Sequence, residues 1–264
     1  MQTEPRHLAE QVEAVASLPA GAEERFSGYG VMGLPMRSGH VLALRRYPAS
    51  SVGPGYTSVW HRTPDGDWTL YANVSARRSC ARFFGAIASD AIETEIRVAW
   101  LGPSRLRVVM PAVPFEWEMV VGATAATRFM NAAGRLLPKT AWQRPAVLAA
   151  MGLMAGPLLG VGHVGLQGTV PNGQHFIANP RLMWTIVDSR ARLAGEDLGR
   201  PGPVHPQARL GDFWIPQRGI LAIGQTYFAP FDPARHSAQT CRSPAKDSSP
   251  ATGSPPAARP TPDP

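Results

Sequence analysis

The alternation of apolar and polar residues predicts β-strands over most of the chain. Residues 92–99 alternate at every second position, which is the pattern of a strand with one face in water. Residues 56–62 and 67–74 flank a Thr-Pro-Asp-Gly turn and predict a hairpin. Residues 40–47 predict a strand that is apolar on both sides. Further strands are expected at residues 105–110, 115–121, 164–170, 174–178, 182–187 and 219–228.

Helical spacing of apolar residues occurs in three places. Residues 7–16 carry Leu8 and Val12 on one side and predict a short amphipathic helix. Residues 123–137 and 146–155 predict two more helices, and the second is expected to end at Gly156-Pro157. Glycines and prolines gather between residues 28 and 39, which predicts a segment rich in turns.

These elements predict a mainly β fold, a large antiparallel barrel or sandwich with a two-helix insertion. We expect an N-terminal helical segment at 1–25 and a β-rich domain at 26–231 that contains the insertion at 122–160. Residues 232–264 are rich in Pro, Ala, Ser and Thr and predict a disordered tail, because such a segment cannot bury enough apolar surface.

No charged residue occurs between Arg144 and Arg181, although charged residues make up 17% of the chain. A surface needs charge more often than this, so the segment should be buried, line an apolar cavity or touch a membrane. Its many glycines argue against a spanning helix. A lid over an apolar cavity and ordinary core packing remain alternatives.

The net charge of +7 comes almost entirely from arginines, since Lys139 and Lys246 are the two lysines. The arginines are spread along the chain rather than clustered among aromatic residues, which argues against a nucleic-acid partner. Cys80 and Cys241 have neither disulfide-framework nor zinc spacing. Together with an N-terminus that lacks the pattern of a signal peptide, they favour a cytoplasmic protein.

Three residues are candidates for acid–base chemistry. His163 lies inside the charge-free segment, and an isolated buried imidazole can exchange a proton near neutral pH. Glu116 shares a strand face with Glu118, and two carboxylates that face a cavity would raise each other's pKa. Asp212 stands among aromatic residues, where it is either desolvated or caps a turn. No metal or cofactor motif is present, so no cofactor is expected.

Between residues 41 and 110 the chain carries, in order, Pro54-Gly55-Tyr56-Thr57, a hairpin, a strand containing Tyr71, and Arg82-Phe83-Phe84-Gly85. With this order the stretch resembles the acetoacetate decarboxylase-like β-barrel superfamily. The family continues with Pro-Lys, whereas this chain has Ala86-Ile87, so the lysine motif for Schiff-base chemistry is absent. The resemblance therefore implies a closed β structure around an apolar pocket and not the activity. A lipocalin-like barrel is the alternative, suggested by the β content and the apolar helices.

The function predicted from these features is binding of a small hydrophobic molecule, such as a fatty acid, terpenoid or polyketide. The alternatives are an enzyme acting on such a ligand by acid–base chemistry, or a protein that docks on a membrane or a partner through the helical insertion. The residues expected to contact the ligand are aromatic or apolar, with one histidine: Trp60, His61, Trp117, Met151, Leu153, Met154, Leu158, Leu159 and Trp184.

Overall fold

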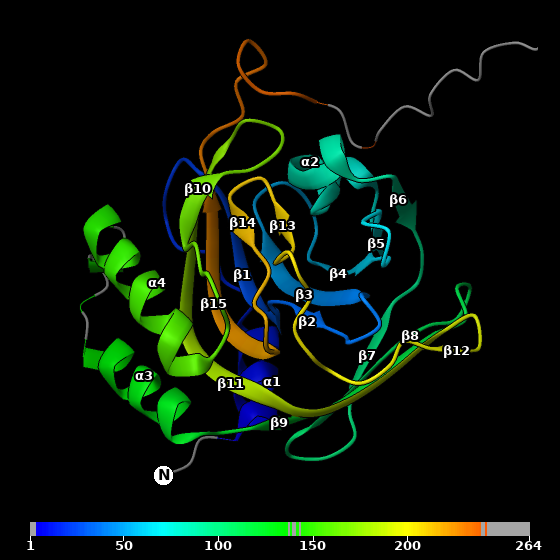
Figure 1. Ribbon diagram of the computed structural model, residues 1–264. Helices are drawn as coiled ribbons and strands as arrows, with labels where there is room; N and C mark the ends of the chain where they lie inside the picture. The colour runs from blue at the N-terminus through cyan, green and yellow to red at the C-terminus, as the bar shows by residue number, and fades with distance from the viewer. Residues whose placement is uncertain (1–3, 137, 139–140, 143, 239–240, 242–264) are drawn as a thin grey trace, which may run out of the picture.

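One curled β-sheet dominates the structure, as the sequence predicted for the fold class (Figure 1). The computed structural model describes residues 4–136, 138, 141–142, 144–238 and 241. The strands follow the order β6-β5-β4-β3-β1-β15-β11-β9-β8-β7, and β2, β10 and β12 pair at the sides of this path. Their bounds are β1 Glu24–Val31, β2 Leu34–Pro35, β3 Val41–Ser50, β4 Tyr56–Arg62, β5 Trp68–Ala72, β6 Asp90–Glu93, β7 Arg97–Trp100, β8 Arg105–Met110, β9 Phe115–Gly122, β10 Gln167–Thr169, β11 His175–Leu193, β12 Glu196–Asp197 and β15 Ile220–Phe228.

The two ends of the sheet are joined by a very short connection. β6 and β7 are the terminal strands of the path, yet Glu93 and Arg97 are only four residues apart in the chain. An extended chain of that length spans at most about 14 Å, so the sheet must curl until its edges approach each other. The pairing is antiparallel except between β5 and β6, which run parallel and thus depart from the predicted antiparallel arrangement.

Helices and a small hairpin cover the sheet. α3 and α4 lie side by side next to β11 and β15, whereas α2 lies near β4 and β6 (Figure 1). The bounds are α1 Pro5–Val15, α2 Ala81–Phe84, α3 Ala125–Leu136 and α4 Pro145–Leu159, and the hairpin consists of β13 Arg209–Leu210 and β14 Phe213–Trp214. Among the described residues, no helix combines the length and the apolarity needed to cross a membrane.

Both faces of β3 are buried, which agrees with the doubly apolar pattern of residues 40–47. Along β3, Leu42 and Leu44 join one hydrophobic cluster with Trp117, whereas Val41 and Ala43 join a second cluster. Successive side chains of a strand point to opposite faces, so the two clusters lie on opposite sides of the sheet. β3 therefore lies between two cores, and any charged residue in its middle has to find a partner inside the protein.

Two predicted elements have different bounds in the structure. The single strand expected at 92–99 is wrong, because the chain leaves β6 at Glu93 and crosses to the other edge of the sheet before β7 begins. The helix expected to end at Gly156-Pro157 continues to Leu159 and ends at Gly160 in the left-handed conformation. Pro157 lies in the last turn of the helix, so any bend that it forces affects only the end of α4.

Two further predictions are wrong. The strands expected at 174–178 and 182–187 form one continuous strand, β11, because Pro180 sits where the register of β11 and β15 shifts and no N–H is required. Residues 28–31, the first part of the segment expected to be rich in turns, belong to β1. A side chain at Gly28 would collide with the carbonyl oxygen of Arg46, so this glycine permits close strand approach instead of a turn.

Most other elements agree with their predicted ranges. β4 and β8 have the predicted bounds, and α1, β3, β5, β9, α3 and β15 differ from the predictions by a few residues at their ends. β10 is shorter than the strand expected at 164–170. Most of the predicted disordered tail lies outside the described residues. Its first part, from Asp232 to Ser237, packs back on the turn at Asn172 through a backbone hydrogen bond.

Candidate functional site

A cavity of about 100 Å³ lies between α4 and the face of the sheet formed by β1, β15 and β11. On this measure of volume it is several times larger than a site for one water molecule. Its helical wall consists of Met130 from α3 and of Met151, Ala155 and Leu159 from α4. The segment that follows α4 and the β13–β14 hairpin form further walls, with Leu166 and Trp214 among the lining residues.

Small residues and irregular strand pairing make room for the cavity in the sheet. Gly28 of β1 and Gly224 of β15 are register partners, and both line the cavity. The β1–β3 register shifts next to Gly28, and the β11–β15 register shifts next to Gly224. Such bulges bend a strand and increase its twist. A side chain at Gly224 would collide with the carbonyl oxygen of Asn179, so glycine is required for this geometry.

Among the described residues, Arg45 is the one charged residue that lines the cavity. Its side chain is buried, with 3% of the residue exposed. Nη1 donates to the carbonyl oxygens of Val31 at 2.6 Å and Leu44 at 2.9 Å, and Nη2 donates to that of Met32 at 3.2 Å. The guanidinium also lies 4.5 Å from the ring centre of Trp60 and 5.5 Å from that of Phe213.

Asn179 of β11 is another lining residue, but the strand register directs its side chain away from the cavity face. It pairs with Gln225, which pairs with Ser27, and these residues share the face of Tyr29 and not that of Gly28 and Gly224. Asn179 is buried, and its Oδ1 has no hydrogen-bond partner among the described residues.

A smaller cavity of about 30 Å³ lies on the other side of Arg45. Arg45, Tyr47 and Phe213 line both cavities, so the guanidinium forms part of the wall between them. The smaller cavity is lined mainly by aromatic rings and by Cys80, whose thiol lies 3.3 Å from the Tyr56 hydroxyl. Burial raises the pKa of Cys80, so the thiol stays protonated and is a poor nucleophile.

The predicted ligand-contacting residues fall into three groups. Met151 and Leu159 line the larger cavity, and Trp60 lines the smaller one. Trp117 and Trp184 are buried in the cluster on the opposite face of the sheet. The remaining apolar members of the set lie on the outer surface of α4, away from the cavity: Leu153, Met154 and Leu158.

His61 is buried in β4 and contacts a second histidine rather than the cavity. Its Nε2 lies 3.0 Å from Nδ1 of His40, and the two rings stack. Burial, with a smaller contribution from His40, lowers the pKa of His61 to about 4. His61 is therefore neutral at physiological pH.

The three acid–base candidates are not brought together around the cavity. His163 is exposed and packs edge-on against Trp214, a lining residue, with ring centres 4.7 Å apart. Asp212 accepts a hydrogen bond from the backbone N–H of Thr169 at 2.8 Å, as expected of a residue that fixes a turn. Glu116 lies on the polar face of β9 and forms an ion pair with Arg107 at 2.7 Å.

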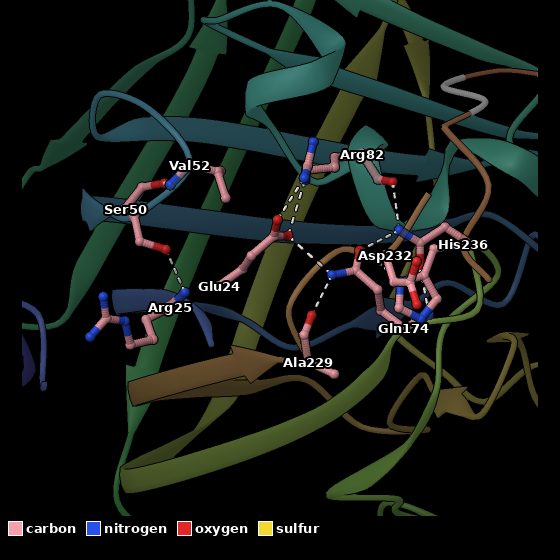
Figure 2. Close-up of polar contacts among 11 residues, drawn as sticks. Glu24, Arg25, Ser50, Val52, Arg82, Gln174, Ala229, Asp232 and His236 are labelled. Carbon is pink, nitrogen blue, oxygen red and sulfur yellow. Dashed lines mark hydrogen bonds and ion pairs between the residues drawn. The ribbon is translucent and has the colours of Figure 1, made fainter. Parts of the chain in front are cut away.

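A polar network joins one end of β1 to α2 and to the segment after β15 (Figure 2). Arg82 donates to both oxygens of Glu24, at 2.6 and 3.0 Å. Gln174 donates to Glu24 at 3.2 Å and to the carbonyl oxygen of Ala229 at 2.6 Å. Asn172 binds Gln174 at 2.6 Å. The network satisfies the buried carboxylate from two sides, so we assign it a structural role.

No group of histidine, cysteine and acidic side chains suited to a metal ion occurs in the part of the chain that the structure describes. Both lysines of the chain, Lys139 and Lys246, lie outside the described residues. The larger cavity thus has mainly apolar walls, one guanidinium and a few uncharged polar residues, among them Tyr47 and Thr226.

The sequence reasoning did not select Arg45 or Asn179. A signal for Arg45 was present, because it stands in a strand that is apolar on both sides, where an arginine cannot reach water. Asn179 carried no such signal, since it follows an apolar run next to Pro180 and looks like a turn residue.

Comparison with protein-family models and with curated proteins finds no match for this chain. Among solved structures, the chain is similar to the crystal structure of an acetoacetate decarboxylase from Legionella pneumophila, with a TM-score of 0.34 and 11% sequence identity. The match covers 81% of this chain and 87% of that one. A likeness at this level carries no argument about activity or ligand, and nothing supports the lipocalin-like alternative.

Proposed function

We propose that the protein binds a small, largely apolar molecule in the cavity between α4 and the sheet. The observation that carries this proposal is the cavity of about 100 Å³ with methionine, leucine and tryptophan side chains in its wall. Small-molecule sites are typically concave and apolar, with a few polar groups that fix orientation. The charge-free segment predicted from the sequence then acts as the cover of the cavity.

Binding is favoured over acid–base catalysis by the composition of the wall. No histidine, aspartate or glutamate of the described residues lines the larger cavity. A general base has to lie within hydrogen-bond reach of the proton that it removes. His163, Glu116 and Asp212 do not meet this condition for a molecule bound in this cavity.

A pair of matched substitutions on α4 tests the proposal. Ala155 faces the cavity, whereas Ala149 of the same helix is exposed. Ala155→Met should fill the cavity and weaken the uptake of octanoate, measured by native mass spectrometry and titration calorimetry, by at least about tenfold. Ala149→Met should have no effect. Equal uptake by both variants and the parent protein, or no uptake by any of them from a panel of fatty acids and terpenoids, would contradict the proposal.

Docking on a membrane surface is a second candidate, favoured by the outer face of the helical pair. Large apolar side chains are exposed on this face: Phe129, Leu136, Leu153, Met154 and Leu158. Residues 119–187 contain no Asp or Glu, so this face carries no acidic charge to repel anionic lipid. Monomeric proteins rarely expose large contiguous apolar areas, and such areas mark interaction sites.

Vesicle flotation tests this second candidate. The protein should float with phosphatidylglycerol vesicles more than with phosphatidylcholine vesicles, and Leu153→Gln combined with Leu158→Gln should abolish flotation. Leu101→Gln is the matched control, since Leu101 is an exposed leucine in the turn between β7 and β8. No flotation of the parent protein, or loss in the control, would exclude docking through this face.

A further inference from the structure

Arg45 has an unusual charge balance for a buried residue. It is almost fully buried, and no carboxylate lies within ion-pair distance of it among the described residues. An arginine side chain does not lose its proton inside a protein. The positive charge is therefore present in the interior at every physiological pH, and the protein needs something to compensate it.

The protein compensates this charge only in part. Three hydrogen bonds to backbone carbonyl oxygens use three of the five N–H groups of the guanidinium. The rings of Trp60 and Phe213 add cation–π attraction. These partners are dipoles and quadrupoles without net charge. A buried cation held in this way still lacks the counter-ion that such groups normally have.

The location of Arg45 shows where a counter-ion fits. The residue lines the larger apolar cavity and forms part of the wall towards the smaller one. An anionic group at Arg45 can therefore belong to a molecule whose apolar part fills the space between α4 and the sheet.

A singly charged carboxylate fits this site better than a phosphate. One guanidinium fork matches the two oxygens of a carboxylate. A phosphate group would bring a second negative charge and a third terminal oxygen into a wall that offers one cation and aromatic rings.

We infer that the ligand of this cavity is an amphiphilic monocarboxylate whose carboxylate pairs with Arg45 and whose apolar chain lies against α4. This inference rests on the proposed function and specifies its ligand class.

A head-group series tests the inference on the intact protein. Octanoate, 1-octanol, octylammonium and octyl phosphate share one apolar chain and differ in charge and shape. Titration calorimetry at pH 7.5 should give octanoate an affinity at least about tenfold higher than that of each of the others. The same ranking should appear as thermal stabilisation of the protein at equal ligand concentrations.

Substitutions at two consecutive arginines then locate the effect. Arg45→Met should lower the octanoate affinity to that of 1-octanol, and Arg45→Lys should keep part of the preference because it retains charge without the fork. Arg46→Met is the matched control, since this side chain lies on the other face of β3. It should leave the ranking unchanged.

The possible outcomes separate the inference from the function on which it rests. Equal binding of all four compounds, or tighter binding of octyl phosphate, would overturn the inference that the ligand is a carboxylate. The proposal that the cavity binds a small apolar molecule would not be affected. No binding of any compound would count against the proposed function itself. If Arg45→Met fails to fold, the ranking with the parent protein and with Arg45→Lys still decides the question.

Discussion

Arg45 and Arg46 are consecutive residues of one strand, and they meet their surroundings in opposite ways. Arg46 points to the face where α1 packs and forms an ion pair with Glu13 at 3.2 Å. Arg45 points to the cavity face and has carbonyl oxygens and aromatic rings as neighbours. The difference teaches that the role of an arginine in a buried strand does not follow from its position in the sequence. The role depends on whether the fold places an acidic side chain next to the guanidinium.

Arg82 strengthens the comparison. It is a partly buried arginine of α2 with a bidentate carboxylate partner, Glu24 at the start of β1, and a surrounding amide network (Figure 2). Two arginines that serve the structure thus carry their own acids, whereas Arg45 at the cavity has none among the described residues. A charge left without its counter-ion next to an apolar cavity is what a site for an anionic ligand requires.

The largest effect on stability is expected at His61, a buried base that can lose its proton and become neutral, which an arginine cannot do. Its pKa in the folded protein is about 4 against an ordinary value of 6.5. Between these values the unfolded chain binds the proton and the folded protein does not, so stability is complete above pH 6.5 and falls as the pH is lowered to 4. The loss should be about 3 kcal/mol from pH 7 to pH 4.

Urea unfolding across this pH range measures the effect. His61→Asn should remove most of the pH dependence in this window. The exposed His175 provides the control, and the His175→Asn variant should keep the pH dependence of the parent protein. A parent protein whose stability stays flat between pH 6.5 and pH 4 would show that His61 titrates normally.

The next effect concerns the paired arginine of the network. Glu24→Gln removes the negative charge that Arg82 and Gln174 share and should lower the free energy of unfolding by about 2 kcal/mol, because a largely buried charge loses its partner. Denaturant unfolding at pH 7 gives the value. Glu23→Gln, at the exposed neighbouring glutamate, should change it by less than about 0.5 kcal/mol. Similar changes in the free energy of unfolding for the two variants would contradict the structural role assigned to the network.

A change in β11 should act in the opposite direction. Asn179→Val removes a buried polar atom without a described partner and should stabilise the protein by about 1 kcal/mol. Thermal unfolding of the parent protein and the variant measures the effect. A destabilised variant would mean that the Asn179 side chain makes packing contacts or hydrogen bonds that valine cannot replace.

The smallest effect is expected at Glu13, the partner of Arg46. Burial alone would raise the pKa of Glu13, but hydrogen bonds from Arg46 and Tyr29 outweigh burial and hold the pKa below its usual value. The stability from this group is therefore present above that usual value and is lost as the pH falls through the folded-state pKa. Because the pair is partly exposed, Glu13→Gln should cost only about 0.5 kcal/mol at pH 7. A loss above about 2 kcal/mol would mean that the pair is as important as the Glu24–Arg82 pair.

The sequence predicted the regular parts of the fold well. β4 and β8 were found at their predicted bounds because a turn directly follows the first and directly precedes the second. The prediction of turns from glycines was less successful. Gly28 was assigned to a segment rich in turns, yet it lies within β1, where its purpose is close strand approach. The break expected between residues 178 and 182 is absent, because β11 continues through a register shift at Pro180. Such purposes depend on neighbouring strands that are distant in sequence.

The candidate site could be predicted only in its apolar half. The absence of charge between Arg144 and Arg181 pointed to α4, and Met151 and Leu159 line the cavity. The orientation around the helix was not predictable, because α4 is apolar on all sides, and so Leu153 was assigned to the pocket although it faces outwards. The role of Arg45 depends on the absence of an acid across the cavity, which no local pattern reveals.

The position of β15 has a consequence for how the protein is made. β15 is the last long strand in the chain, yet it lies near the middle of the sheet, between β1 and β11, and contributes Ala222 and Gly224 to the cavity. During synthesis the first half of the chain emerges without the strand that joins it to the second half. Pairing of residues about 200 positions apart closes a very long loop, so folding should be slow. The complete sheet should form only after Phe228 has left the ribosome.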